Sequence, residues 1–216
     1  MKKKPAIEDL LKVMARLRSP TGCPWDREQS HMTLRRHAIE EVYELIDAIE
    51  AKDDREMAEE LGDLLLQVVF HCQLARERGA FDFDKVCRLI VQKLIRRHPH
   101  VFGQTKVKGV DEVWANWEKI KHAEKKGTRH ERASAFDGIP KHLPALLRAE
   151  KLVKKARKAR LLSDVQKPER SSTKAALAEE LFELAELAQR RDWSAEELLT
   201  AEIKKRERAF RRLEKV

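Results

Sequence analysis

Apolar residues recur along most of the chain at intervals of three and four, the spacing that places them on one face of an α-helix. The pattern predicts helices separated by turn residues at about 6–18, 31–51, 54–78, 82–97, 111–125, 142–160, 172–190 and 194–214. The strict alternation of apolar and polar residues that is typical of β-strands does not occur. We therefore predict an all-α fold.

The helices predicted for 31–51 and 54–78 carry apolar stripes. The stripe residues are Ile39, Val42, Ile46 and Ile49 on the first helix and Leu61, Leu64, Leu65 and Val68 on the second. Because the turn at 51–54 is short, the two helices should form an antiparallel hairpin with both stripes facing a common core. After Gln67 the second helix is apolar nearly all round, so it needs cover on several sides.

Composition agrees with long helices. The 216 residues include only 7 Gly and 7 Pro, and 38% of them are charged. No apolar run approaches the roughly 20 residues of a membrane span, and residues 1–17 read as an amphipathic helix rather than a signal peptide. Cys23, Cys72 and Cys87 are scattered, so we expect a cytoplasmic protein without a disulfide framework.

The charge is unevenly distributed. The chain carries a formal net charge of +9, but residues 37–63 contain eleven acids and two bases. The overall charge suggests an anionic partner such as nucleic acid. The acidic island argues against nucleic acid and favours a site that holds cations.

Two pairs of acids give this island a defined geometry. Glu41 and Glu44 share one helix face, and Glu60 and Asp63 share another. Counting residues outward from the turn between the two helices places Glu44 level with Glu60 and Glu41 level with Asp63. In each pair the two positions differ by about 1.5 Å along the helix axis. Carboxylates that repel at close range are stabilised by a divalent ion, and Mg²⁺ is preferred where phosphate supplies further oxygens. A solvated acidic face is the alternative, but the matched register favours a metal site.

A dinuclear iron bundle would instead need Glu-x-x-His pairs on two helices. The residue three positions after Glu60 is Asp63, and oxygen-only ligation argues against iron and zinc. His71 lies on the hydrophobic side of its helix. We interpret it as a core or dimer-contact residue.

Cations and aromatic residues suggest contacts to a phosphorylated ligand. Lys93 and Arg97 lie four apart in the helix predicted for 82–97, where they can bind phosphate or can be ordinary cations near a helix end. Trp117 and Lys121 are also four apart, so the tryptophan could stack on a nucleobase while the lysine contacts a phosphate. Spacing alone favours a tryptophan in the core.

Several motifs follow one another between about residues 8 and 158. They are GCPWD at 22–26, EE-x-x-E at 40–44, ELGD at 60–63, RRHPHVF at 96–102, WEKIK at 117–121 and IPKHLPAL at 139–146. In this order they resemble the MazG family of nucleoside triphosphate pyrophosphohydrolases, whose signature is EExxE…ExxD.

The resemblance implies a Mg²⁺-dependent enzyme that splits a nucleoside triphosphate into a monophosphate and pyrophosphate. It also implies an antiparallel helical bundle completed by dimerisation. Its metal ligands fall on Glu41, Glu44, Glu60 and Asp63, and its water-orienting or neighbouring acids fall on Glu40 and Glu59. Its substrate contacts fall on His37, Lys93, Arg97, Trp117 and Lys121. His37 and Glu56 stand where some members carry lysine.

The longer family members contain two modules. We interpret residues 1–130 as an N-terminal module with an intact acidic motif, 131–160 as a linker and connecting helix, and 161–216 as a shortened, degenerate second module. Residues 177–183 resemble 58–63, but no EE-x-x-E precedes them. Activity is therefore expected from the first module.

Three functions remain open at this stage. The first is the pyrophosphohydrolase, acting as a homodimer on a nucleoside triphosphate with no membrane partner. The second is a catalytically weak nucleotide-binding regulator or adaptor of the same fold. The third is a basic helical nucleic-acid binder, whose binding would be salt-sensitive.

Overall fold

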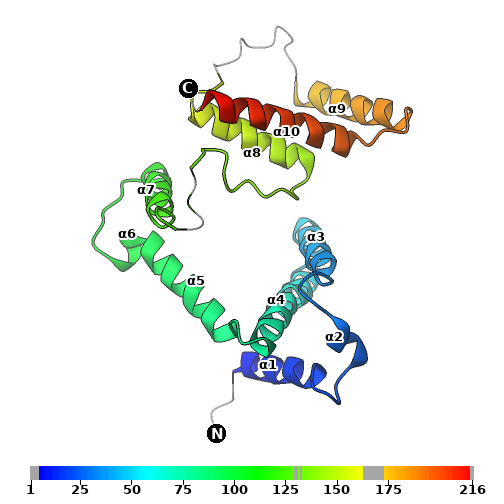
Figure 1. Cartoon of the computed structure of the whole chain (residues 1–216), viewed down its shortest axis with the longest axis vertical. Coiled ribbons are helices and arrows are strands. Elements are labelled where there is room, and N and C mark those ends of the chain that lie inside the picture. The colour runs from blue at the N-terminus through cyan, green and yellow to red at the C-terminus, as the bar shows by residue number, and fades with distance from the viewer. Residues whose placement is uncertain (1–4, 129–130, 132, 163–172, 215–216) are drawn as a thin grey trace. The chain divides into compact units, whose positions relative to one another are not determined.

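The computed structural model of this chain describes residues 5–128, 131, 133–162 and 173–214. Every regular element within them is a helix, so the predicted all-α fold is confirmed (Figure 1). The chain divides into two compact units, Met1–Trp117 and Glu118–Val216, with a boundary inside α7 (Val110–Ala123). Among the described residues, no helix is both long and apolar enough to cross a membrane.

The first unit is organised around the hairpin of α3 (Arg35–Ala51) and α4 (Asp54–Glu77). The two helices lie side by side and antiparallel, as predicted (Figure 1). Lys52 ends α3 in the left-handed conformation with φ 57°. The Asp53 side chain then caps α4 by accepting hydrogen bonds from two backbone N–H groups of its first turn. This turn fixes the register between the acidic residues of the two helices.

The core of the first unit lies toward the C-terminal end of α4, where α1 (Ala6–Leu17) packs against it. The buried cluster consists of Met14, Leu34, Val69 and Phe70. The predicted need for cover after Gln67 is confirmed by Val69 and Phe70, which are almost fully buried. After Gly79, α5 (Phe83–Arg97) begins beside this end of α4, with Asp82 as its cap.

The prediction that the apolar stripes of the hairpin face a common core is wrong for the single chain. Two adjacent helices bury only a narrow strip of each other, and α1 covers the other end of α4. The stripe residues that stay 39–54% exposed are Ile39, Val42, Ile46, Ile49, Leu61, Leu65 and Val68. On α5, the apolar residues Leu89, Ile90 and Leu94 are also exposed.

Two short helices were not predicted, α2 (Pro24–Glu28) and α6 (Pro99–Phe102). Each starts with proline, whose fixed φ and missing N–H suit the first helical position. Neither is long enough to show an apolar period. The first long helix of the hairpin also starts later than predicted, at Arg35 instead of 31.

The second unit contains α8 (Ala145–Lys158), α9 (Lys174–Gln189) and α10 (Ala195–Leu213). α8 and α10 lie side by side around a core that includes Phe136, Leu152 and Ile203. The segment predicted as a connecting helix, α8, packs along α10 in this unit. The division into modules at 130 and 160 stays a prediction. The loop predicted around 163–172 lies outside the described residues.

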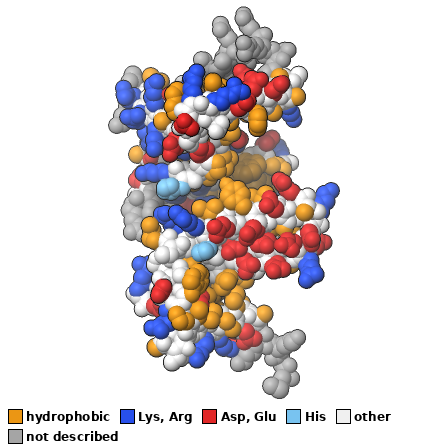
Figure 2. Space-filling model, turned by 90° about the vertical axis from the view of Figure 1, so that its right-hand side faces the viewer, with side chains coloured by type: hydrophobic (Ala, Val, Ile, Leu, Met, Phe, Trp, Pro, Cys, Tyr) orange, Lys and Arg blue, Asp and Glu red, His pale blue; other side chains and the backbone are white. Residues whose placement is uncertain are grey.

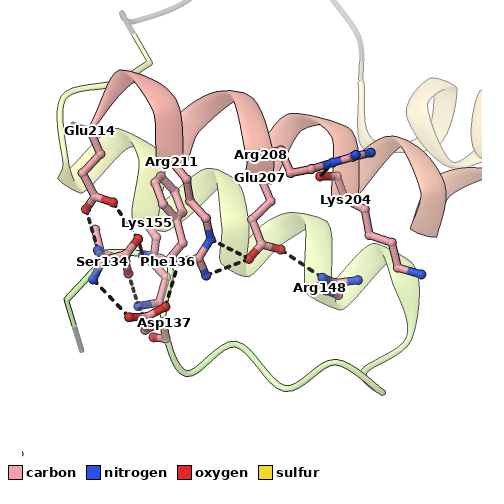
Figure 3. A network of polar contacts seen from close by, with 11 residues as sticks. Ser134, Phe136, Asp137, Arg148, Lys155, Lys204, Glu207, Arg208, Arg211 and Glu214 are labelled. Atoms are coloured by element: carbon pink, nitrogen blue, oxygen red, sulfur yellow. Dashed lines mark hydrogen bonds and ion pairs between the residues drawn. The ribbon is translucent and has the colours of Figure 1, made fainter. Parts of the chain in front are cut away.

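A polar network joins α10 to α8 and to the segment before α8 (Figure 3). Arg148, only 6% exposed, donates from Nη2 to Glu207 Oε2 at 2.9 Å. Arg211 donates to Glu207 at 2.9 Å and to Asp137 at 2.8 Å. Because these charges compensate one another at low exposure, the network fixes how the two helices pack.

Candidate carboxylate metal site

Three carboxylates converge between the helices of the hairpin. One side-chain oxygen from each of Glu41, Glu60 and Asp63 lies within 4.8 Å of the other two. All three residues are at least partly buried. The convergence predicted from the register is therefore confirmed for these three, and Figure 2 shows the surrounding acidic side chains gathered in one patch.

Burial and the charges of the cluster raise the pKa values of Glu41 and Glu60. Burial raises the pKa of Glu41, and the nearby charges of Asp63 and Glu44 raise it further. Burial also raises the pKa of Glu60, followed by the charge of Glu44 and then that of Asp63. Glu44 is exposed and is not one of the three closest carboxylates. Its charge nevertheless raises the pKa of Glu41 on α3 and of Glu60 on α4. Such repulsion favours a bound cation.

Gln67 adds a neutral contact to the cluster. It is 8% exposed and lies one turn beyond Asp63 on α4. Its Nε2 donates a hydrogen bond to Glu41 Oε1 at 3.2 Å, which acts against the raised pKa of Glu41. Within the described residues its own Oε1 is buried without a hydrogen-bond partner. In the sequence, only the one-turn spacing of Gln67 from Asp63 hints at this contact.

The predicted acids for water activation lie beside the cluster in the sequence and are exposed. These are Glu40 on α3 and Glu59 on α4. His37 Nδ1 lies 3.2 Å from Glu40 Oε2. The ring of Trp25 approaches His37 edge-on, with 5.8 Å between ring centroids. Trp25 was not among the predicted site residues.

The predicted phosphate contacts on α5 do not lie beside the hairpin in one chain. Lys93 and Arg97 lie in the C-terminal half of α5, which diverges from the hairpin (Figure 1). Trp117 packs against the rings of His98 and Trp114 at 5.2 and 5.7 Å. Lys121 lies in the second unit, where it pairs with the neighbouring Glu118.

His71 packs within the first unit against a second histidine. Its ring stacks on that of His31, and the two Nδ1 atoms are 2.8 Å apart. Burial, followed by the charge of His31, lowers the pKa of His71. His71 is thus a partly buried residue with a partner inside its own unit, in keeping with the core alternative of the prediction.

Fold and site together define an all-α protein with a candidate divalent-cation site on a helical hairpin. Residues 29–102, which include the whole cluster, match the model of the MazG nucleotide pyrophosphohydrolase domain. This chain belongs to the MazG family, as its similarity to curated proteins also shows.

The chain is 49% identical over 150 residues to the nucleoside triphosphate pyrophosphohydrolase of Escherichia coli, covering 69% of this chain and 56% of that protein. It is 46% identical over 190 residues to the nucleoside triphosphate pyrophosphohydrolase/pyrophosphatase MazG of Thermotoga maritima, covering 88% of this chain and 70% of that protein. It thus spans little more than half the length of the Escherichia coli relative.

Proposed function

We propose that this chain hydrolyses nucleoside triphosphates to nucleoside monophosphates and pyrophosphate. The observation that carries the proposal is the convergence of Glu41, Glu60 and Asp63 inside the segment that matches the family model. The activities printed in the names of the Escherichia coli and Thermotoga maritima relatives support it.

The donor set fits Mg²⁺. The cluster offers only carboxylate oxygens, which hard cations prefer and which softer metals do not select. Glu41, Glu44, Glu60 and Asp63 would hold the ion. When bound, Mg²⁺ would supply positive charge to the triphosphate and to the charge that develops during hydrolysis.

The remaining chemistry belongs to side chains around the cluster. Water attacks the α-phosphorus, and either Glu40 or Glu59 orients that water and takes its proton. Lys93 and Arg97 neutralise the departing pyrophosphate. The two contacts that the resemblance assigns to Trp117 and Lys121 remain predictions.

The active form is proposed to be a homodimer. The exposed stripes of α3 and α4, together with the apolar residues of α5, leave a large hydrophobic surface on one chain. A second copy packed there would bury this surface across a two-fold axis. The second copy would also bring its own α5, with Lys93 and Arg97, near the carboxylate cluster. In one chain, α5 diverges from the hairpin that carries this cluster.

We propose that this activity is cytoplasmic, which the three free thiols of Cys23, Cys72 and Cys87 support. The test is pyrophosphate release from a panel of nucleoside triphosphates with and without Mg²⁺. Release that needs Mg²⁺ and yields the monophosphate supports the proposal. Nucleotide binding without any release would contradict it and favour a regulatory protein.

A further inference from the structure

An aromatic ring is held in an exposed position beside His37, near the start of α3. Trp25 is 51% exposed, whereas the next residue, Asp26, is 9% exposed. The backbone around the ring is anchored, since Arg18 donates to the Asp26 carbonyl and Gln29 Nε2 donates to the Trp25 carbonyl at 3.0 Å. The ring is therefore fixed by its backbone while much of its surface remains open to a ligand.

The ring contacts a residue of α3 that lies one turn from the proposed metal ligand Glu41. It contacts the edge of His37 at 5.8 Å between centroids, with an interplanar angle of 67°. His37 is one turn before Glu41 on the same face of α3, about 6 Å along the helix axis. Trp25 on α2 thus contacts the residue of α3 that lies one turn before Glu41.

A nucleotide can span from such a ring to the cluster, because its ribose separates the base from the α-phosphate. We propose that Trp25 stacks on the nucleobase of the substrate, with His37 against its edge, while the phosphates lie at the carboxylate cluster. The inference rests on the proposed function. Stacking on indole is open to every base, so the platform accepts all common bases and favours the larger purines.

Trp117 is the competing platform. It is partly buried, His98 and Trp114 already contact its ring, and its Nε1 is buried without a partner among the described residues. Less of its ring surface is therefore open to a base than that of Trp25.

The experiment compares ATP hydrolysis by Trp25→Ala, Trp25→Phe and the control Trp114→Ala, which removes another exposed tryptophan of the first unit. Loss of stacking should raise the KM for ATP about tenfold in Trp25→Ala and leave kcat within about twofold. Trp25→Phe should restore most of the affinity. Trp114→Ala should behave as wild type.

Inorganic triphosphate separates a base contact from a general structural effect, since it has phosphates and no base. Its inhibition constant should be unchanged in Trp25→Ala. An unchanged KM, or a triphosphate inhibition constant that rises in parallel with KM, overturns the proposal. A rise in KM with Trp117→Phe but not with Trp25→Ala overturns it in favour of Trp117.

If the wild-type protein releases no pyrophosphate, the proposed function fails while the platform can still be tested. Calorimetric titration with Mg²⁺–ATP and with Mg²⁺–triphosphate then replaces kinetics. Selective loss of ATP affinity in Trp25→Ala supports the platform. Equal affinities of wild type and Trp25→Ala for ATP reject it.

Discussion

Gln67 reaches across the α3–α4 hairpin and hydrogen-bonds Glu41, with 3.2 Å between Nε2 and Oε1. The bond occupies one oxygen of Glu41 and restrains the rotation of its carboxylate. The other oxygen is left for a cation. Outer contacts of this kind orient metal ligands and commonly contribute to metal affinity.

Gln67→Leu should therefore raise the Mg²⁺ concentration needed for half-maximal pyrophosphate release about tenfold. Saturating Mg²⁺ should recover most of the rate, because no group that contacts substrate is lost. The matched control is Gln73→Leu on the same helix, which removes a similar bond to Glu77 outside the cluster. Equal Mg²⁺ requirements in the two variants would count against a positioning role.

Glu41→Gln should abolish hydrolysis and leave the metal-free protein as stable as wild type or more so at pH 7. The folded-state pKa values of Glu41 and Glu60 are raised above the usual 4.5. Their contribution to stability is therefore present below pH 4.5 and is lost as the pH rises through the raised values. Removing one charge relieves repulsion that persists at neutral pH.

Thermal melts with and without Mg²⁺ measure this effect. The Mg²⁺-induced rise in Tm should be smaller in Glu41→Gln than in wild type. Glu50→Gln, at an exposed position of the same helix, is the control and should keep both the activity and the full rise. Full activity in Glu41→Gln would remove Glu41 from the site.

The sequence predicted the hairpin and the convergence of Glu41, Glu60 and Asp63 because both depend on local rules, helical spacing and a short turn. The bond of Gln67 could not be predicted, because it depends on how the two helices rotate about their axes. Trp25 lies in a helix too short for periodicity to detect. The exposure of Ile46 was missed because an apolar stripe does not reveal which chain covers it.

The Arg18–Glu77 pair gives the first unit a pH-dependent contribution to stability. Arg18 donates to Glu77 through Nε at 2.7 Å and Nη2 at 2.6 Å, and these bonds hold the pKa of Glu77 below 4.5. This contribution is present above pH 4.5 and is lost as the pH falls through the lowered value. Glu77→Gln should destabilise the first unit by about 1 kcal/mol at pH 7, since the carboxylate is partly exposed.

Hydrogen exchange of α4 amides at pH 7, followed by urea unfolding over a series of lower pH values, measures this loss. The difference between wild type and Glu77→Gln should shrink as the pH falls below 4.5. Glu8→Gln, an exposed change on α1, should have little effect. A difference that stays constant with pH would exclude the ion pair as its cause.

Glu207→Gln should destabilise the second unit by roughly 3 kcal/mol, because it leaves the Arg148 guanidinium buried without its compensating charge. Exchange of α8 and α10 amides should accelerate, whereas Glu197→Gln at an exposed position of α10 should not change it. Pyrophosphate release should persist, because the cluster lies in the first unit. Unchanged exchange would mean that the network does not fix the packing of the two helices.

The exposed apolar stripes predict a homodimer of about twice 25.2 kDa at low micromolar concentration, measured by light scattering. The expected interface is of the size class of obligate dimers, about 2,000 Å² or more.

Replacing both Ile46 and Leu65 by lysine should give a folded monomer with little activity, since charges cannot be buried there without partners. Phe182→Lys, on the exposed face of α9, should remain dimeric. Dissociation by Phe182→Lys alone would move the interface to the second unit, and a fully active wild-type monomer would show that the site is complete in one chain.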